Sequence, residues 1–200
     1  IGPVRRPSLF QLRPDWWTAK FLAKIGFKAF GDDHLLTSVI KYIETEGFKI
    51  IGVHEVLGDI LAIEGVFGKI KPDEQALADI EHGVKIARGL GALDVGQSVI
   101  VQQGIVLGVE AVEGTDALIK RCKDLKRDGL GGVLVKTKKP QQEQRADLPT
   151  IGVSTVENAA ASGLRGIAVQ AGKTLIVDRA AVVAKADSLG LFVVGVKIQE

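Results

Sequence analysis

The 200-residue sequence contains no methionine and a single cysteine, Cys122. One cysteine cannot form a disulfide within the chain, which is typical of proteins from a reducing compartment. Cys122 lies in a helical pattern flanked by Lys and Arg, and we interpret it as an ordinary helix residue rather than a nucleophile. Because methionine is absent, we expect residue 1 to lie inside a longer protein.

Long apolar runs and a strong charge of one sign are also missing. No run approaches the roughly 18 residues needed to cross a bilayer, and no signal peptide is recognisable, so we expect a cytoplasmic protein. The 26 Lys and Arg residues nearly balance the 24 Asp and Glu residues. The resulting net charge of +2 gives no general attraction for nucleic acid. A hydrophobic content of 46% is enough to form a globular core.

Several familiar catalytic motifs are missing as well. His34, His54 and His82 lie far apart and lack metal-binding spacing, which argues against a zinc site built on them. No Gly-x-Ser-x-Gly motif is present for a serine nucleophile. Residues 171–174 (AGKT) resemble the end of a phosphate-binding P-loop but lack its upstream glycine, so we interpret them as a turn.

The first quarter of the chain has three distinct patterns. Residues 1–15 contain three prolines and three arginines, which predict an extended linker from an upstream domain. Residues 16–30 have the spacing of a basic amphipathic helix, which could pack against its own protein or lie on an anionic membrane surface. A second helix is expected over residues 32–46, followed by a buried strand over 48–53.

The remaining chain alternates between helical and strand patterns, which predicts an α/β fold with a mixed β-sheet and flanking helices. Two strand pairs are separated by connections too short for crossovers, so we expect two hairpins. Residues 63–72 and 138–145 are expected to be loops, the second of them mobile. Helices are expected over residues 54–61, 72–89, 115–126, 154–162 and 179–189, and strands over 97–101, 105–112, 133–137, 167–169, 174–177 and 191–196.

Acidic residues follow the first expected hairpin. Glu110 and Glu113 precede a helix that begins near Thr115 and Asp116. Strand alternation would point the two glutamates to opposite faces. These residues could cap the helix, or their carboxylates and hydroxyl could bind a hard cation or a ribose, and the spacing leaves both possibilities open.

Asp147 lies between the polar loop and Pro149, just before a helix expected to begin near residue 154. Free N–H groups at that helix start could bind a phosphate oxygen, while the carboxylate binds a metal or orients water. A turn aspartate bonded to its own backbone is the alternative.

Eight blocks, in this order, resemble the LpxI-type UDP-2,3-diacylglucosamine pyrophosphatases of lipid A synthesis in Gram-negative bacteria. They are residues 4–9 (VRRPSL), 31–33 (GDD), 52–55 (GVHE), 94–97 (DVGQ), 101–104 (VQQG), 108–116 (GVEAVEGTD), 134–136 (LVK) and 147–152 (DLPTIG). The resemblance covers nearly the whole chain. It implies that residues 16–200 form the C-terminal catalytic domain, preceded by a linker from an absent N-terminal domain that covers the substrate.

The resemblance also implies the reaction and its residues. UDP-2,3-diacylglucosamine would be hydrolysed to UMP and 2,3-diacylglucosamine 1-phosphate with Mg²⁺. Asp147 would be the essential acid, and Lys136 would stabilise charge on the departing phosphate. Candidate substrate-binding residues are Gln102, Gln103, Thr115 and Thr150, and candidate metal ligands are Asp147, Glu110, Glu113 and Asp116.

The rival hypothesis is a non-catalytic binding or oligomerisation module of the same fold. Edge strands of the hairpins could support a homodimer. An acylated, anionic substrate would also fit peripheral contact of the basic helix with the inner membrane.

Overall fold

The computed structural model describes residues 15, 16, 20 and 32–199. The chain divides into two units, residues 1–51 and 52–200. In the first unit, helix α2 (Asp32–Thr45) confirms the helix expected over 32–46. The basic helix expected over 16–30 lies almost wholly outside the described residues, and its membrane role stays a prediction.

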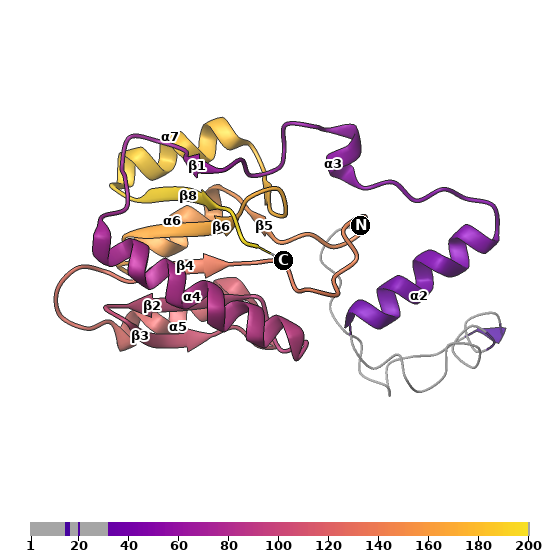
Figure 1. The fold of residues 1–200 in the computed structure, drawn as a ribbon, viewed down its shortest axis with the longest axis horizontal. Coiled ribbons are helices and arrows are strands. Elements are labelled where there is room, and N and C mark those ends of the chain that lie inside the picture. Colours follow the sequence, from indigo (N-terminus) through magenta and orange to yellow (C-terminus); the bar gives the residue numbers. More distant parts are fainter. Residues whose placement is uncertain (1–14, 17–19, 21–31, 200) are drawn as a thin grey trace. The chain divides into compact units, whose positions relative to one another are not determined.

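The described part of the second unit is built on a six-stranded mixed sheet in the order β1-β8-β6-β4-β2-β3 (Figure 1). Strands β4, β6 and β8 run parallel, whereas β2 is antiparallel to both of its neighbours and β1 is antiparallel to β8. The expected mixed α/β fold is therefore confirmed. The strands are β1 (Gly65–Val66), β2 (Ser98–Gln102), β3 (Ile105–Val109), β4 (Val133–Lys136), β6 (Gly166–Gln170) and β8 (Phe192–Val196).

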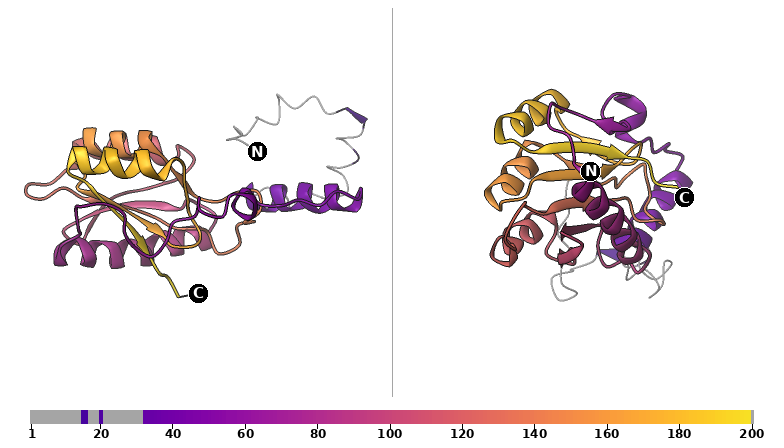
Figure 2. Two further views of the ribbon diagram at one scale, coloured as in Figure 1. Left: turned by 90° about the horizontal axis from the view of Figure 1, so that it is seen from above. Right: turned by 60° about the vertical axis from the view of Figure 1, so that its left-hand side comes forward.

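Helices cover both faces of this sheet. Helix α4 (Glu74–Ala92) packs on one face, and α5 (Thr115–Cys122), α6 (Val153–Ala161) and α7 (Arg179–Leu189) pack on the other (Figure 2). A short 3-10 turn (Lys123–Leu125) follows α5. Because successive strand residues face opposite ways, Val133 and Val135 enter the core under α4, whereas Leu134 enters the core under the other helices.

An acidic residue caps the N-terminus of each of the two helices α4 and α7. The Asp73 carboxylate accepts a hydrogen bond from the Ala76 N–H at 2.8 Å and caps α4. The Asp178 carboxylate caps α7 through the Ala181 N–H at 3.1 Å. Both helices were expected close to these bounds, and in each an acidic residue ahead of the helix satisfies a free N–H group of the first turn.

Only the first of the two expected hairpins exists. Strands β2 and β3 are joined by Gln103 and Gly104, both with positive φ (53° and 78°), as a tight two-residue hairpin turn requires. The second hairpin was wrong. Strand β6 lies between β4 and β8, and β7 (Leu175–Ile176) pairs in parallel with β5 (Thr150–Ile151) in a separate two-stranded sheet.

Two short segments also differ from expectation. The strand expected over 48–53 was wrong, because no described strand pairs with it and Phe48 and Ile51 are exposed; helix α3 (Val53–Val56) follows. The expected loop over 63–72 contains edge strand β1. Its close approach to β8 depends on Gly195, where a Cβ would lie 1.9 Å from the Ile63 carbonyl oxygen.

Two glycines on α4 allow a matched test of packing. A Cβ at Gly83 would lie 2.6 Å from a methyl carbon of Val135, whereas nothing lies within 4 Å of a Cβ at Gly89. We expect Gly89→Ala to raise the free energy of unfolding by about 1 kcal/mol, the difference in helix propensity. Gly83→Ala should lower it by about 1–3 kcal/mol, because the stiff Val135 side chain cannot move aside freely. Urea unfolding of both variants measures this, and equal stabilisation by both would contradict the packing shown here.

Candidate active site

A buried lysine lies at the carboxyl end of β4. Lys136 points to the face covered by α5, α6 and α7, where its Nζ donates a hydrogen bond to Thr115 Oγ1 at 2.7 Å. Thr115 begins α5, and its hydroxyl donates to Glu110 Oε1 at 2.8 Å. Glu110 Oε2 accepts from the Gln97 N–H at 3.3 Å. The ammonium, hydroxyl and carboxylate therefore form one hydrogen-bonded chain.

Three carboxylates act on the Lys136 ammonium. Burial lowers the pKa of Lys136 below its ordinary value, because charge is poorly solvated there, while the negative charges of Glu110, Asp116 and Asp147 raise it. The structure thus brings four of the expected catalytic and metal-binding residues into one electrostatic cluster.

Asp147 reaches this cluster from the loop that follows β4. Its Oδ2 accepts a hydrogen bond from Gln142 Nε2 at 2.6 Å, and its backbone N–H donates to the Glu143 carbonyl at 2.9 Å. The carboxylate thus has a side-chain partner, unlike that of a turn aspartate bonded to its own backbone. Three residues later, Thr150 begins β5 and donates its hydroxyl hydrogen to the Leu148 carbonyl at 3.0 Å.

Helix α6 begins directly after β5. The Gly152 N–H donates to Thr155 Oγ1 at 3.3 Å at the start of this helix. One turn further along, Asn158 Nδ2 donates to Asp116 Oδ1 at 3.1 Å and joins α6 to α5. The positive end of the α5 dipole lies beside Lys136, because Thr115 begins that helix, and it favours an anionic ligand.

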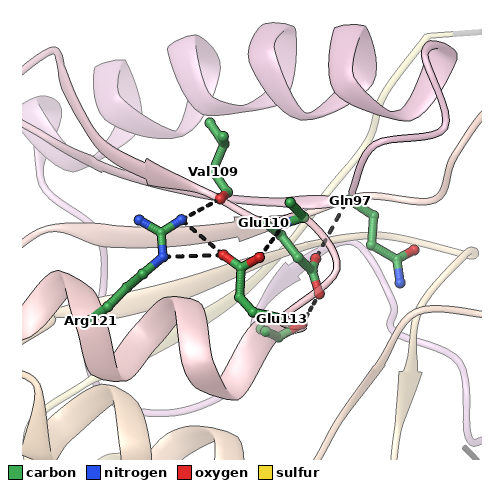
Figure 3. Close-up of polar contacts among 7 residues, drawn as sticks. Gln97, Val109, Glu110, Glu113 and Arg121 are labelled. Atoms are coloured by element: carbon green, nitrogen blue, oxygen red, sulfur yellow. Dashed lines mark hydrogen bonds and ion pairs between the residues drawn. The ribbon is translucent and has the colours of Figure 1, made fainter. Parts of the chain in front are cut away.

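Glu113 and Glu110 diverge, as Figure 3 shows. Glu113 Oε1 accepts two hydrogen bonds from Arg121, from Nε at 3.1 Å and from Nη2 at 2.9 Å. The two glutamates lie beyond the end of β3, so the turn between β3 and α5 separates them, rather than the strand alternation we expected. Glu113 is held by Arg121 and is not among the carboxylates that act on Lys136.

Gln102 and Gln103 lie at the opposite end of the sheet. Because β2 and β4 are antiparallel, Ser98 pairs with Lys136, and Gln102 follows four residues later, roughly 13 Å along the strand. Gln102 Nε2 donates to the Arg127 and Leu130 carbonyls, both at 2.8 Å. Gln103 Nε2 donates to a carbonyl of the same loop at 3.3 Å. The structure does not bring these two glutamines together with the lysine cluster, and both hold the loop ahead of β4.

Three polar residues of the cluster were missing from the sequence-based set. Asn158 and Gln142 each hold a carboxylate, and the Ser98 hydroxyl lies 3.4 Å from that of Thr115. Helical spacing offers no sign of the Asn158 contact, because its partner lies on another helix. Ser98 has no signal along the chain either, because it joins the cluster through the pairing of β2 with β4, which places it opposite Lys136.

Among residues 32–199 and the few described before them, no three His, Cys, Asp or Glu side chains form a group that could hold a metal ion. No described helix is both long and apolar enough to cross a membrane.

The fold and the position of the cluster are typical of α/β domains that bind a ligand at one edge of an open sheet. Helices enclose a mixed sheet on both faces, and polar side chains gather at the carboxyl end of a parallel strand, where open α/β sheets bind their ligands. The family model described as the LpxI C-terminal domain matches residues 63–194, and the LpxI N-terminal domain model matches residues 1–60. The chain belongs to the LpxI family.

A curated relative agrees with both matches. The protein named UDP-2,3-diacylglucosamine pyrophosphatase LpxI, from Caulobacter vibrioides, is 48% identical over 206 aligned residues, which cover all of this chain and 74% of the relative. The family models separate the two domains between residues 60 and 63. The division expected from the sequence was different, with a linker over 1–15 and the C-terminal domain from residue 16.

Burial of Lys136 predicts how stability depends on pH. Since its folded-state pKa is lowered from 10.5, the unfolded chain binds this proton more tightly, and stability rises with pH between the lowered value and 10.5. Lys136→Met removes that contribution. We therefore expect the free energy of unfolding of the wild type, relative to the variant, to increase from neutral pH to about pH 10. Urea unfolding across this range measures it, and a difference that stays constant with pH would contradict a lowered pKa.

Proposed function

We propose that this chain hydrolyses the pyrophosphate bond of UDP-2,3-diacylglucosamine to UMP and 2,3-diacylglucosamine 1-phosphate, a reaction of lipid A synthesis. The observation that carries the proposal is the 48% identity, along the entire chain, to a relative named for this activity. The cluster of Lys136 and Asp147 lies in the domain that matches the family's C-terminal model and supplies suitable chemistry.

In the proposed reaction, water attacks one phosphorus of the pyrophosphate and the bridging P–O bond breaks. The water oxygen remains on one product, and the bridging oxygen leaves with the other. Asp147 orients the water and accepts its proton. Lys136 balances the negative charge that develops on the departing phosphate, which is the main demand of phosphoryl transfer.

The hydrogen-bonded chain behind Lys136 suits this role. Thr115 accepts from the ammonium and donates to Glu110, so the hydroxyl can hold Nζ in place without neutralising it. A bound pyrophosphate would add negative charge beside a lysine that burial alone tends to discharge. Substrate binding would thereby favour the ammonium form that the reaction needs.

We also propose that a divalent cation, normally Mg²⁺, binds together with the substrate. Mg²⁺ sites commonly use one or two carboxylates and complete the shell with phosphate oxygens and water, so a three-carboxylate group is not required. Asp147 and Asp116 fit this donor set best, since both act on Lys136, whereas Glu113 is held by Arg121. Glu110 also acts on Lys136, but both of its carboxylate oxygens already accept hydrogen bonds. The cation would stabilise negative charge on the phosphate oxygens.

Asp147→Asn provides the test of the catalytic assignment. With Mg²⁺ and UDP-2,3-diacylglucosamine, we expect the variant to release UMP about 10²- to 10⁴-fold more slowly than the wild type, because the amide cannot accept the proton. The matched control is Asp124→Asn, which alters an exposed carboxylate on the turn after α5 and should retain activity. An unchanged rate in Asp147→Asn would remove Asp147 from the mechanism.

The rival hypothesis of a non-catalytic module predicts a different result. A wild-type chain that binds UDP-2,3-diacylglucosamine, measured by calorimetry, but releases no UMP would favour that module.

Removal of the cation forms a separate prediction. We expect UMP release to stop in EDTA and to return when Mg²⁺ is added in excess. The reason is that Asp147 and Asp116 need a cation to approach the negatively charged pyrophosphate without repulsion. Full activity in EDTA would contradict the metal requirement while leaving the hydrolase assignment intact.

Two further expectations remain predictions. A homodimer formed through a sheet edge would use β3, whose first residues Ile105 and Val106 are exposed. Membrane contact by the helix expected over 16–30 can be checked by sedimentation with anionic liposomes.

A further inference from the structure

Gln142 holds the carboxylate of the proposed catalytic aspartate. Its side chain is 3% exposed, and its Nε2 donates to Asp147 Oδ2 at 2.6 Å. Its Oε1 accepts from the Lys139 N–H at 3.2 Å, and its own backbone N–H donates to the Lys139 carbonyl at 3.1 Å. Both ends of the buried amide are therefore used.

The partners of Gln142 determine the orientation of its amide. A backbone N–H can only donate and a carboxylate oxygen normally accepts, so rotating the amide by half a turn would place like partners together at both ends. Leaving either buried end unbonded would cost about 1–3 kcal/mol. The Gln142 amide thus presents an N–H to Asp147 in a single arrangement.

The other partner of this amide is itself fixed to the body of the domain. Lys139 Nζ forms an ion pair with Asp94 Oδ1 at 2.6 Å, and the Lys139 side chain is 11% exposed. Asp94 lies just after α4, so the pair joins the loop to the end of a long packed helix. The contact to Asp147 is therefore made from a supported position rather than from a free loop.

We infer that Gln142 is the positioning residue for Asp147 in the reaction, and this inference rests on the proposed function. By holding Oδ2, the Gln142 amide sets the rotation of the carboxylate and leaves Oδ1 to act on the water or the cation. Partners of this kind orient a reacting or metal-binding carboxylate without touching the substrate.

The test uses Gln142→Met in the full chain, because Met preserves the length and volume of the side chain but cannot donate a hydrogen bond. We expect kcat for UMP release to fall about 10- to 100-fold, with KM for UDP-2,3-diacylglucosamine little changed. The matched control is Gln141→Met on the same loop, which removes a 2.8 Å bond from Nε2 to the Gly91 carbonyl but no contact to Asp147. Its kcat should stay near the wild-type value.

A double-mutant comparison separates positioning from loop order. In the Asp147→Asn background, adding Gln142→Met should lower kcat no further, because the carboxylate that Gln142 orients is already gone. Equal losses in both backgrounds, or an equal loss in Gln141→Met, would overturn the inference. Wild-type kcat in Gln142→Met would overturn it too and leave the proposed function standing, whereas absence of UMP release by the wild-type chain would overturn both.

Discussion

Burial of the Lys136 ammonium is the constraint on which the described site depends. A charge removed from water must be compensated locally, and the sheet alone cannot do so, because the strand residues paired with Lys136 are Ser98 and Val169, which carry no charge. Compensation comes from three chain segments: Glu110 just after β3, Thr115 and Asp116 at the start of α5, and Asp147 on the loop after β4. The lysine therefore connects the end of β3, the start of α5 and the loop after β4.

The same constraint explains why buried polar residues lie at the ends of the strands. Ser98, Glu110 and Lys136 are buried at one end of the sheet and Gln102 at the other, whereas the middle of every long strand is apolar on both faces. Both faces are covered by helices, so a buried polar group can be satisfied only at a strand end, where loops and helix starts supply partners. The proposed catalytic residues therefore lie at the same few positions where buried polar groups find partners.

Sequence patterns predicted what depends on neighbours along the chain. Helix α4 follows from its Asp73 cap and apolar spacing, and the first hairpin follows from a glycine turn between β-branched runs. Pairing of the two-residue strands β5 and β7 could not be predicted, because so short a strand has no periodicity. Gln102 and Lys136 both lie in blocks of the family resemblance, yet the antiparallel direction of β2 places them at opposite ends of the sheet, which chain order does not reveal. Gln142 has no sequence signal either, since its role depends on how a loop folds back.

The separate β5–β7 pair has a mechanical consequence. Lys136 belongs to the central sheet, held by neighbours on both sides, whereas the segment just after Asp147 is tied by two paired residues to the segment that enters α7. The distance between Asp147 and Lys136 is therefore not fixed by the pairing of strands within one sheet. Lys136 is fixed by the central sheet, whereas Asp147 is fixed by a loop outside it. Substitutions in residues 138–152 are therefore expected to change the distance between Asp147 and Lys136 without altering the strand pairing of the central sheet.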